Sequence, residues 1–111
     1  MSPEQDDQLI ELIKTVLDDV KATEIRCIRV SAITAMFDYV IIATVESGRQ
    51  SRAACEKIRD LTKPLKIKIL GVEGLDSGEW VLLDTGSIVL HLMRPEARTF
   101  YNLEELWLID K

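Results

Sequence analysis

The spacing of apolar residues along the chain predicts two amphipathic helices. After Ser2-Pro3-Glu4, a typical helix start, the apolar positions recur at helical spacing: Leu9, Leu12, Ile13, Val16, Leu17 and Val20. A first helix is therefore predicted to end near Lys21. A second is predicted to begin at Ser47-Gly48 and to end near Lys63, because Pro64 disfavours its continuation.

The remaining apolar segments are short and predict five strands. These are Ile25–Val30, Asp38–Val45, Lys66–Leu70, Trp80–Thr85 and Ile88–Met93. The first is an edge candidate because its two arginines fall on opposite faces, and the second is apolar enough to be central. The last two strands are predicted to form a hairpin. The strand–helix–strand unit from Asp38 to Leu70 is predicted to form a right-handed crossover between parallel strands. The tail, 96–109, is predicted to be one helix.

The order of these elements predicts an α/β (α+β) fold, a single mixed five-stranded sheet with helices packed on it. With 111 residues, the chain has too little apolar material for two cores, so residues 1–111 are expected to form one domain. Cys27 and Cys55 are too few for a zinc site and are interpreted as small buried hydrophobic residues.

The charge balance disfavours direct, specific binding of nucleic acid. The chain has 19 acidic and 14 basic residues, a net charge of −5, which repels a phosphate backbone unless the basic residues gather on one face. A basic protein partner is compatible with this charge. The longest apolar runs are about seven residues, far below the ~20 needed to span a bilayer. The N-terminus has no secretory pattern, so a cytoplasmic location is expected.

An acidic, glycine-rich segment, Gly71–Gly86, is the first candidate site. It could be a carboxylate-based active site, a metal loop or a surface that binds another protein. A serine hydrolase is excluded because a nucleophile elbow needs glycine two residues on either side of the serine. Around Ser77 the glycines lie three before and one after. A surface that binds another protein is compatible with the acidic residues that flank Trp80.

A metal loop is a further interpretation of this segment. The acidic residues of the segment are Glu73, Asp76, Glu79 and Asp84. Their spacing does not fit an EF-hand, and the chain has a single histidine, too few for a typical zinc site. Adventitious magnesium binding stays a minor alternative, and no cofactor is expected. His91 shares a strand face with Val89 and Met93, which favours a partly buried structural histidine over a ligand, an acid–base group or a contact for the tail.

A possible anion-binding site begins the second helix, at Ser47, Arg49 and Arg52. Free backbone N–H groups at a helix start can bind an anion, and arginines there are mildly opposed by the helix dipole. The occupant could be a nucleotide phosphate, an acidic group of a partner, or an intramolecular carboxylate such as Glu46 or Asp38. A Walker loop is excluded because its glycine and lysine spacing is missing.

The chain also resembles the ribosomal silencing factor S family, also called the Iojap family. The resemblance runs from about Leu9 to Trp107. It lies in Asp38-Tyr39, Ala43-Thr44, Ser47, Arg49, Gly71-Val72-Glu73-Gly74, Trp80-Val81-Leu82, Asp84, Gly86, His91, Pro95, Arg98, Phe100-Tyr101, Leu103-Glu104 and Leu106-Trp107. Val45, Glu46 and Gln50 depart from the family pattern, which bears on the function of that loop but not on the later segment.

The resemblance implies a nucleotidyltransferase-like fold without catalysis. It implies a protein that binds the large ribosomal subunit through the basic ribosomal protein number fourteen and sterically blocks subunit joining, repressing translation when nutrients run short. We therefore expect Trp80 and Leu82 to contact the partner, together with the acids Glu73, Asp76 and Glu79. Core packing is the other interpretation of Trp80.

Two alternatives stay open. One is a nucleotidyltransferase-like, nucleotide-binding enzyme acting at Ser47 and Arg49 with nearby acids, although the Gly-Ser order of such enzymes is reversed here. The other is a homodimer that uses the same apolar face for self-association. Tyr101 and Trp107 are expected to pack the tail against the rest of the molecule.

Overall fold

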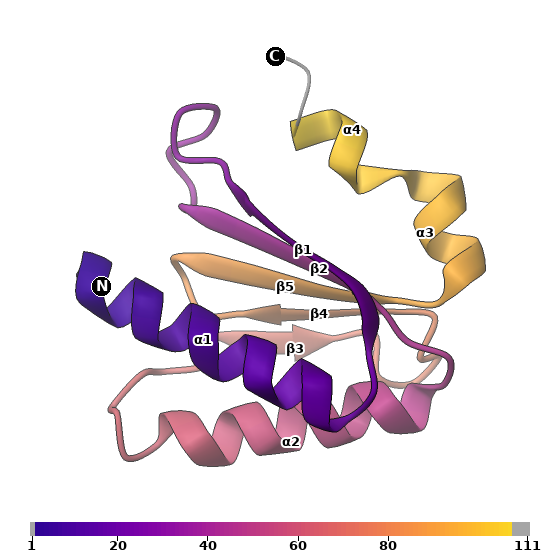
Figure 1. The fold of residues 1–111 in the computed structure, drawn as a ribbon, viewed down its shortest axis with the longest axis horizontal. Helices are drawn as coiled ribbons and strands as arrows, with labels where there is room; N and C mark the ends of the chain where they lie inside the picture. Colours follow the sequence, from indigo (N-terminus) through magenta and orange to yellow (C-terminus); the bar gives the residue numbers. More distant parts are fainter. Residues whose placement is uncertain (1, 108–111) are drawn as a thin grey trace.

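The computed structural model describes residues 2–107, which form one five-stranded sheet with helices on both faces (Figure 1). The strand order is β1-β2-β5-β4-β3. The strands are β1 (Thr23–Arg29), β2 (Tyr39–Thr44), β3 (Gly71–Glu73), β4 (Trp80–Asp84) and β5 (Ile88–Met93). The helices are α1 (Pro3–Asp19), α2 (Gly48–Thr62), α3 (Pro95–Tyr101) and α4 (Leu103–Trp107). The predicted mixed sheet with helices packed on it is confirmed.

The strand directions confirm most of the predicted pairing. β4 and β5 form the predicted antiparallel hairpin, β1 is an edge strand, and β2 is buried on both faces. β2 pairs in parallel with β5. β3 is antiparallel to β4, which is antiparallel to β5, so β3 also runs parallel to β2. The connection through α2 thus joins two parallel strands, but β5 and β4 lie between them.

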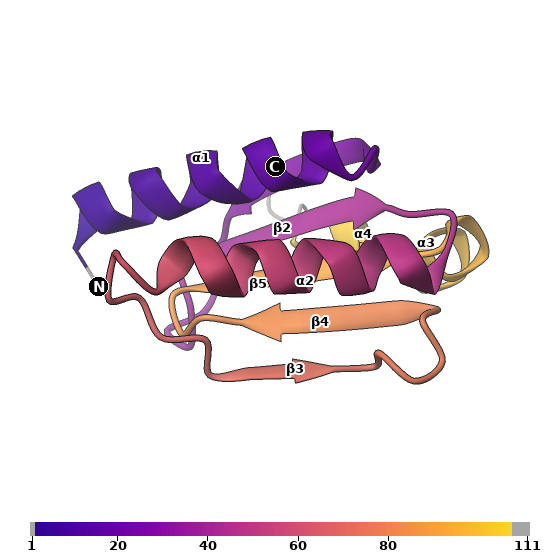
Figure 2. The same ribbon diagram turned by 90° about the horizontal axis from the view of Figure 1, so that it is seen from below.

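Alternation along the strands builds two separate hydrophobic clusters. Ile41 and Ala43 of β2 face α1 and α2, where they join the larger cluster with residues such as Leu9 and Ile58. Successive side chains of a strand point to opposite faces, so Val40 and Ile42 join the smaller cluster on the other face. Figure 2 shows α1 and α2 side by side across the near face, with α3 and α4 behind the sheet.

The second face of the sheet is only partly covered. The hydrophobic cluster on this face comes from β1 and the residue after it, β2, the end of β5, and α3: Ile28, Val30, Val40, Ile42, Met93 and Ala97. On β4 and β3, the residues that point to this face stay partly or fully exposed, among them Leu82, Asp84 and Glu73. Three of the predicted partner-binding residues, Glu73, Trp80 and Leu82, lie on this half of the sheet, and Asp76 and Glu79 lie in the turn that precedes Trp80.

Two predicted elements were wrong. Lys66–Leu70 is not a strand: Lys66 has a left-handed backbone (φ 59°), and the ladder with β4 extends only over Gly71–Glu73. Ile67 is nonetheless buried between exposed lysines, so the alternation marked burial but not pairing. The tail is not one helix, because Asn102 adopts φ 49° and separates α3 from α4. Its last two predicted residues, 108–109, lie outside the described residues.

Candidate functional site

Sheet register brings three residues from different strands into one row. Glu73 of β3 pairs with Leu82 of β4, and Leu82 pairs with His91 of β5. Residues paired across strands project to the same face. Trp80 and Asp84, two residues before and after Leu82 on β4, share this face, whereas Val81 and Leu83 are buried under α1 and α2. We call Glu73, Trp80, Leu82, Asp84 and His91 the open sheet face.

Trp80 is partly exposed and held by two contacts. Its indole Nε1 donates a hydrogen bond to Nδ1 of His91 at 3.0 Å. Its ring lies against that of Tyr101 of α3, with the centroids 4.6 Å apart. The side chain also packs at the margin of the smaller hydrophobic cluster. Trp80 therefore has structural contacts and an exposed part at once, so core packing and contact with a partner are compatible roles for it.

His91 is a buried, neutral histidine, in keeping with the structural interpretation. The residue is 8% exposed, and burial lowers the pKa of its imidazole from 6.5 to about 4. At neutral pH its Nδ1 carries a lone pair, which accepts the indole hydrogen of Trp80. A protonated imidazole has two N–H donors and could not accept this bond. The neutral state of His91 thus orients the indole.

The turn between β3 and β4 is fixed by two close approaches of the backbone. Gly74 has φ +89°, and a Cβ there would lie 2.1 Å from the carbonyl oxygen of Trp80. Gly78 has φ +72°, and a Cβ there would lie 2.8 Å from Cα of Gly48 at the start of α2. Both positions exclude larger residues. Arg52 adds a hydrogen bond from Nη2 to the carbonyl oxygen of Leu75, at 3.2 Å.

The predicted acidic residues lie at the surface. Glu73 stands beside Leu82 on the open sheet face, and Asp76 and Glu79 lie in the turn that precedes Trp80. Among residues 2–107, no salt bridge involves any of the three, and no group of three or more His, Cys, Asp or Glu residues could hold a metal ion. Their charges are therefore available to a molecule that approaches this end of the sheet.

The possible anion-binding residues have other contacts. The Ser47 hydroxyl accepts a hydrogen bond from the Gln50 backbone N–H, and the Gln50 side chain accepts one from the Ser47 N–H, a capping box that begins α2. Arg52 is bound to the carbonyl of Leu75 rather than to either suggested carboxylate, and Arg49 is exposed. Gln50 also donates to the carbonyl of Val20 at 2.9 Å, so this residue, which departs from the family pattern, ties α2 to the end of α1.

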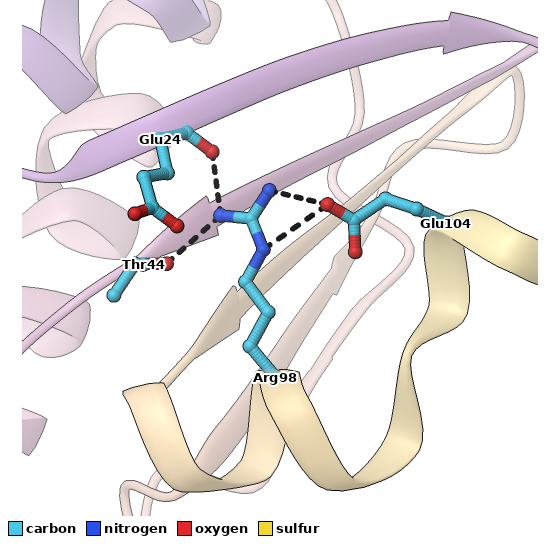
Figure 3. Close-up of polar contacts among 4 residues, drawn as sticks. All are labelled: Glu24, Thr44, Arg98 and Glu104. Carbon is cyan, nitrogen blue, oxygen red and sulfur yellow. Dashed lines mark hydrogen bonds and ion pairs between the residues drawn. The ribbon is translucent and has the colours of Figure 1, made fainter.

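A cluster around Arg98 was not predicted as such, although Arg98 and Glu104 were part of the resemblance. Arg98 is 9% exposed and reaches from α3 to three elements (Figure 3). Its Nη1 donates to the Glu24 carbonyl oxygen of β1 and, at 2.8 Å, to the Thr44 hydroxyl of β2. Its Nη2 lies 2.6 Å from Glu104 Oε2 of α4.

Electrostatics reinforce this cluster. Burial acts to raise the pKa of Glu104, but the hydrogen bond and charge of Arg98 outweigh it and hold that pKa below its usual value. Arg98 thereby fastens α3 and α4 to β1 and β2. Because Tyr101 belongs to α3, this attachment also positions its ring against Trp80 and so stabilises the open sheet face indirectly.

Among residues 2–107, no helix is both long and apolar enough to cross a membrane.

Comparison with known proteins identifies relatives over nearly the whole chain. The family model described as "Ribosomal silencing factor during starvation" matches residues 3–111. The chain is 42% identical to the ribosomal silencing factor RsfS of Zymomonas mobilis, over 91% of this chain and 76% of that protein. It is 38% identical to the chloroplastic protein Iojap of Arabidopsis thaliana, over 88% of this chain but 40% of that protein.

A solved structure agrees with these matches. The crystal structure of a Chromobacterium violaceum protein superposes with a TM-score of 0.85 and 37% identity, covering 91% of this chain and 84% of that one. Fold and sequence therefore support the same assignment over the same residues. The chain belongs to the ribosomal silencing factor family, which includes the Iojap proteins.

Proposed function

We propose that this chain binds the large ribosomal subunit through ribosomal protein number fourteen, sterically blocks subunit joining and so represses translation under nutrient limitation. Membership of the ribosomal silencing factor family supports a regulatory role at the ribosome. The observation that carries the finer proposal is the open sheet face, where an ordered tryptophan and a leucine are partly exposed beside acids that form no salt bridge within residues 2–107. We propose that residues 1–111 act as one domain in this role.

The anchor of the proposed interface is ordered before the partner arrives. Trp80 is held by His91 and Tyr101, so binding would cost little side-chain entropy at this position. Leu82, its neighbour on the same face, would supply apolar area that is lost from water on contact. Aromatic residues in such settings commonly dominate binding energy.

Acidic residues around the anchor would select a basic partner. Glu73 adjoins Leu82, and Asp76 and Glu79 lie at the Trp80 end of β4. Complementary charge speeds association and orients the partner, and it repels acidic surfaces. A basic ribosomal protein fits this combination of an apolar centre and an acidic margin.

Leu82→Glu tests the proposal with little risk to the fold, because Leu82 is partly exposed and Trp80 keeps both contacts. Purified variants are sedimented with large ribosomal subunits through a sucrose gradient. We expect Leu82→Glu to lose co-sedimentation, since a buried, unpaired carboxylate opposes docking. Leu61→Glu is the matched control: Leu61 is 48% exposed on α2, and this variant should still co-sediment.

Two results would contradict the assignment. Retained co-sedimentation of Leu82→Glu would exclude the open sheet face as the binding surface. Loss of binding by the Leu61→Glu control as well would mean that a general charge effect, rather than this face, governs association. Circular dichroism confirms that each variant is folded before the comparison is made.

A nucleotidyltransferase-like enzyme is the rival proposal, and we infer that the chain acts by binding rather than by catalysis. The Ser47 hydroxyl takes part in the helix cap, and Arg52 binds a backbone carbonyl, so these groups are engaged within the chain. Calorimetry with magnesium and each nucleoside triphosphate separates the two proposals. Saturable heat that disappears in Arg49→Gln would favour the enzyme.

Self-association through the open sheet face is a competing use of the same surface. A homodimer would cover Leu82 and Trp80 and would have to dissociate before the ribosomal partner could bind there. Light scattering over a concentration series measures this, and Leu82→Glu should shift the chain toward monomer if the face is shared. Cys55 is buried as predicted, but Cys27 is exposed, so the interpretation as a buried residue is wrong for Cys27. Both thiols are free, which is compatible with a reducing compartment and with the proposed cytoplasmic location.

A further inference from the structure

Basic residues are strongly concentrated in one part of this acidic chain. Residues 49–68 contain seven of the 14 lysines and arginines and two of the 19 acidic residues. This segment therefore has a net charge of +5, against −10 for the rest of the chain. A negative net charge opposes binding to a polyanion when the basic residues are dispersed over the surface, but here half of them lie in one segment.

Four of these residues surround one surface hollow. The C-terminal end of α2 and the segment that follows it enclose about 430 Å³, lined by Arg59, Thr62, Lys63, Lys66, Ile67, Lys68 and Ile69. We call Arg59, Lys63, Lys66 and Lys68 the basic end of α2. All four are exposed, whereas Ile67 between two of the lysines is 7% exposed. The left-handed backbone of Lys66 reverses the chain after α2, so that residues on both sides of this turn line the hollow.

The charges of the basic end are not neutralised by the protein. Within residues 2–107, the salt bridge is that of Arg98 with Glu104, so none of the four cations is paired with a carboxylate. Stabilisation of the helix dipole accounts for a cation in the last turn, where Arg59 stands. It does not account for Lys66 and Lys68, which lie beyond the helix.

The basic end is far from Trp80, although it adjoins the other end of the open sheet face, where the Leu70 N–H donates to the carbonyl oxygen of Asp84 at 2.7 Å. Gly78, in the turn before Trp80, contacts the start of α2, whereas the basic end lies past its other terminus. The 15 residues of α2 span about 22 Å at the usual helical rise. A partner centred on Trp80 and a polyanion at the basic end could therefore be bound together.

We propose that the basic end of α2 binds the phosphate backbone of double-stranded RNA. Lysine ammonium groups bind phosphate as point charges and need no base sequence. No aromatic residue occurs between Val45 and Glu79, so stacking of unpaired bases, which single-strand binding uses, is not available there. Duplex RNA presents a regular backbone and is recognised largely through it.

This surface extends the proposed function by giving the chain a second contact on the ribosome, namely its RNA. The proposal depends on ribosome association only for the source of the duplex. The test therefore uses free RNA, and its outcome is separate from co-sedimentation through the open sheet face. An acidic segment of a protein is the competing ligand and forms one arm of the test.

The experiment is fluorescence anisotropy of a labelled 20-base-pair RNA duplex, titrated with the full chain at several salt concentrations. With four phosphate contacts, the logarithm of the binding constant should fall with the logarithm of salt concentration with a slope of about −3 to −4. In Lys63→Gln/Lys66→Gln/Lys68→Gln, loss of three contacts should bring the slope to about −1 and weaken binding at low salt at least about tenfold.

The matched control is Lys14→Gln/Arg26→Gln/Arg29→Gln, which removes the same charge from exposed positions elsewhere. Its slope and affinity should stay close to those of the unsubstituted chain. Equal weakening of both triple variants, or no salt-dependent binding by the unsubstituted chain, would overturn the proposal. So would competition by a decaglutamate peptide as effective as that by unlabelled duplex at equal charge concentration. Leu82→Glu should bind the duplex normally while losing co-sedimentation.

Discussion

The neutral state of His91 makes the stability of this protein depend on pH in a range where few other groups titrate. Burial lowers the pKa of His91 from 6.5 to about 4, so between these values the unfolded chain binds a proton that the folded chain does not. The contribution of His91 to stability must therefore fall as pH falls through this window and level off below about pH 4. The chain has a single histidine, so no second imidazole contributes.

The magnitude follows from the two pKa values. Linkage gives a loss of about 2 kcal/mol in the free energy of unfolding between pH 7.5 and pH 5, and about 3 kcal/mol by pH 4. In the folded chain His91 gains its proton only near pH 4, where it loses the acceptor for the indole of Trp80, so the ordered anchor would loosen around that pH. The lowered pKa of Glu104 adds a separate loss of stability that begins as pH falls through the ordinary pKa of 4.5 and is complete once the folded carboxylate has gained its proton.

Urea denaturation at half-unit pH intervals from 7.5 to 5 measures the effect. His91→Gln is the reference variant, because its amide oxygen can accept the indole hydrogen bond and does not titrate. We expect its stability to be nearly flat over this range while that of the unsubstituted chain declines by about 2 kcal/mol. Parallel pH profiles for the two proteins would refute the reasoning, since the decline could not then come from His91.

Two further changes test how the open sheet face is held. Gly74→Ala should destabilise the fold by about 2 kcal/mol or more, because Gly74 has a positive φ and a Cβ there would lie 2.1 Å from the carbonyl oxygen of Trp80. The control is Gly71→Ala, whose Cβ would have nothing within 4 Å, and urea denaturation should find this variant nearly as stable as the unsubstituted chain. Arg98→Met should cost about 2 kcal/mol, because it removes the hydrogen bonds of Arg98 to Glu24, Thr44 and Glu104. Hydrogen exchange should then rise first in α3 and α4, and equal exchange in all elements would contradict this attachment.

Much of the sheet could be predicted because each prediction depended on a local pattern. The continuous apolar run of β2 requires burial on both faces, and a turn sequence between two apolar segments gives the β4–β5 hairpin without distant information. The same alternation placed His91 on the face opposite Leu90, where it lies. Of the proposed site, the turn glycines and the shared face of Trp80 and Leu82 follow from such patterns.

The errors came from contacts that local patterns do not encode. Alternation in Lys66–Leu70 signals burial, but a strand also needs a partner in register, and that partner reaches only Gly71–Glu73. The break at Asn102 lies between two short helices that Arg98 attaches to the sheet, and its partners there, Glu24 and Thr44, are far from it in sequence. The gathering of cations at the basic end was visible as a charge bias, but the hollow depends on the turn at Lys66.

The sequence by itself determined which segments are apolar, how they alternate, where the chain turns and which family it resembles, because all of these are properties of neighbouring residues. Only the tertiary structure decided which half of the sheet stays uncovered, that His91 holds Trp80, and that cations from a helix and the segment after it surround one hollow. Those features depend on strand order and on contacts between residues distant along the chain, which are set when all the elements pack together.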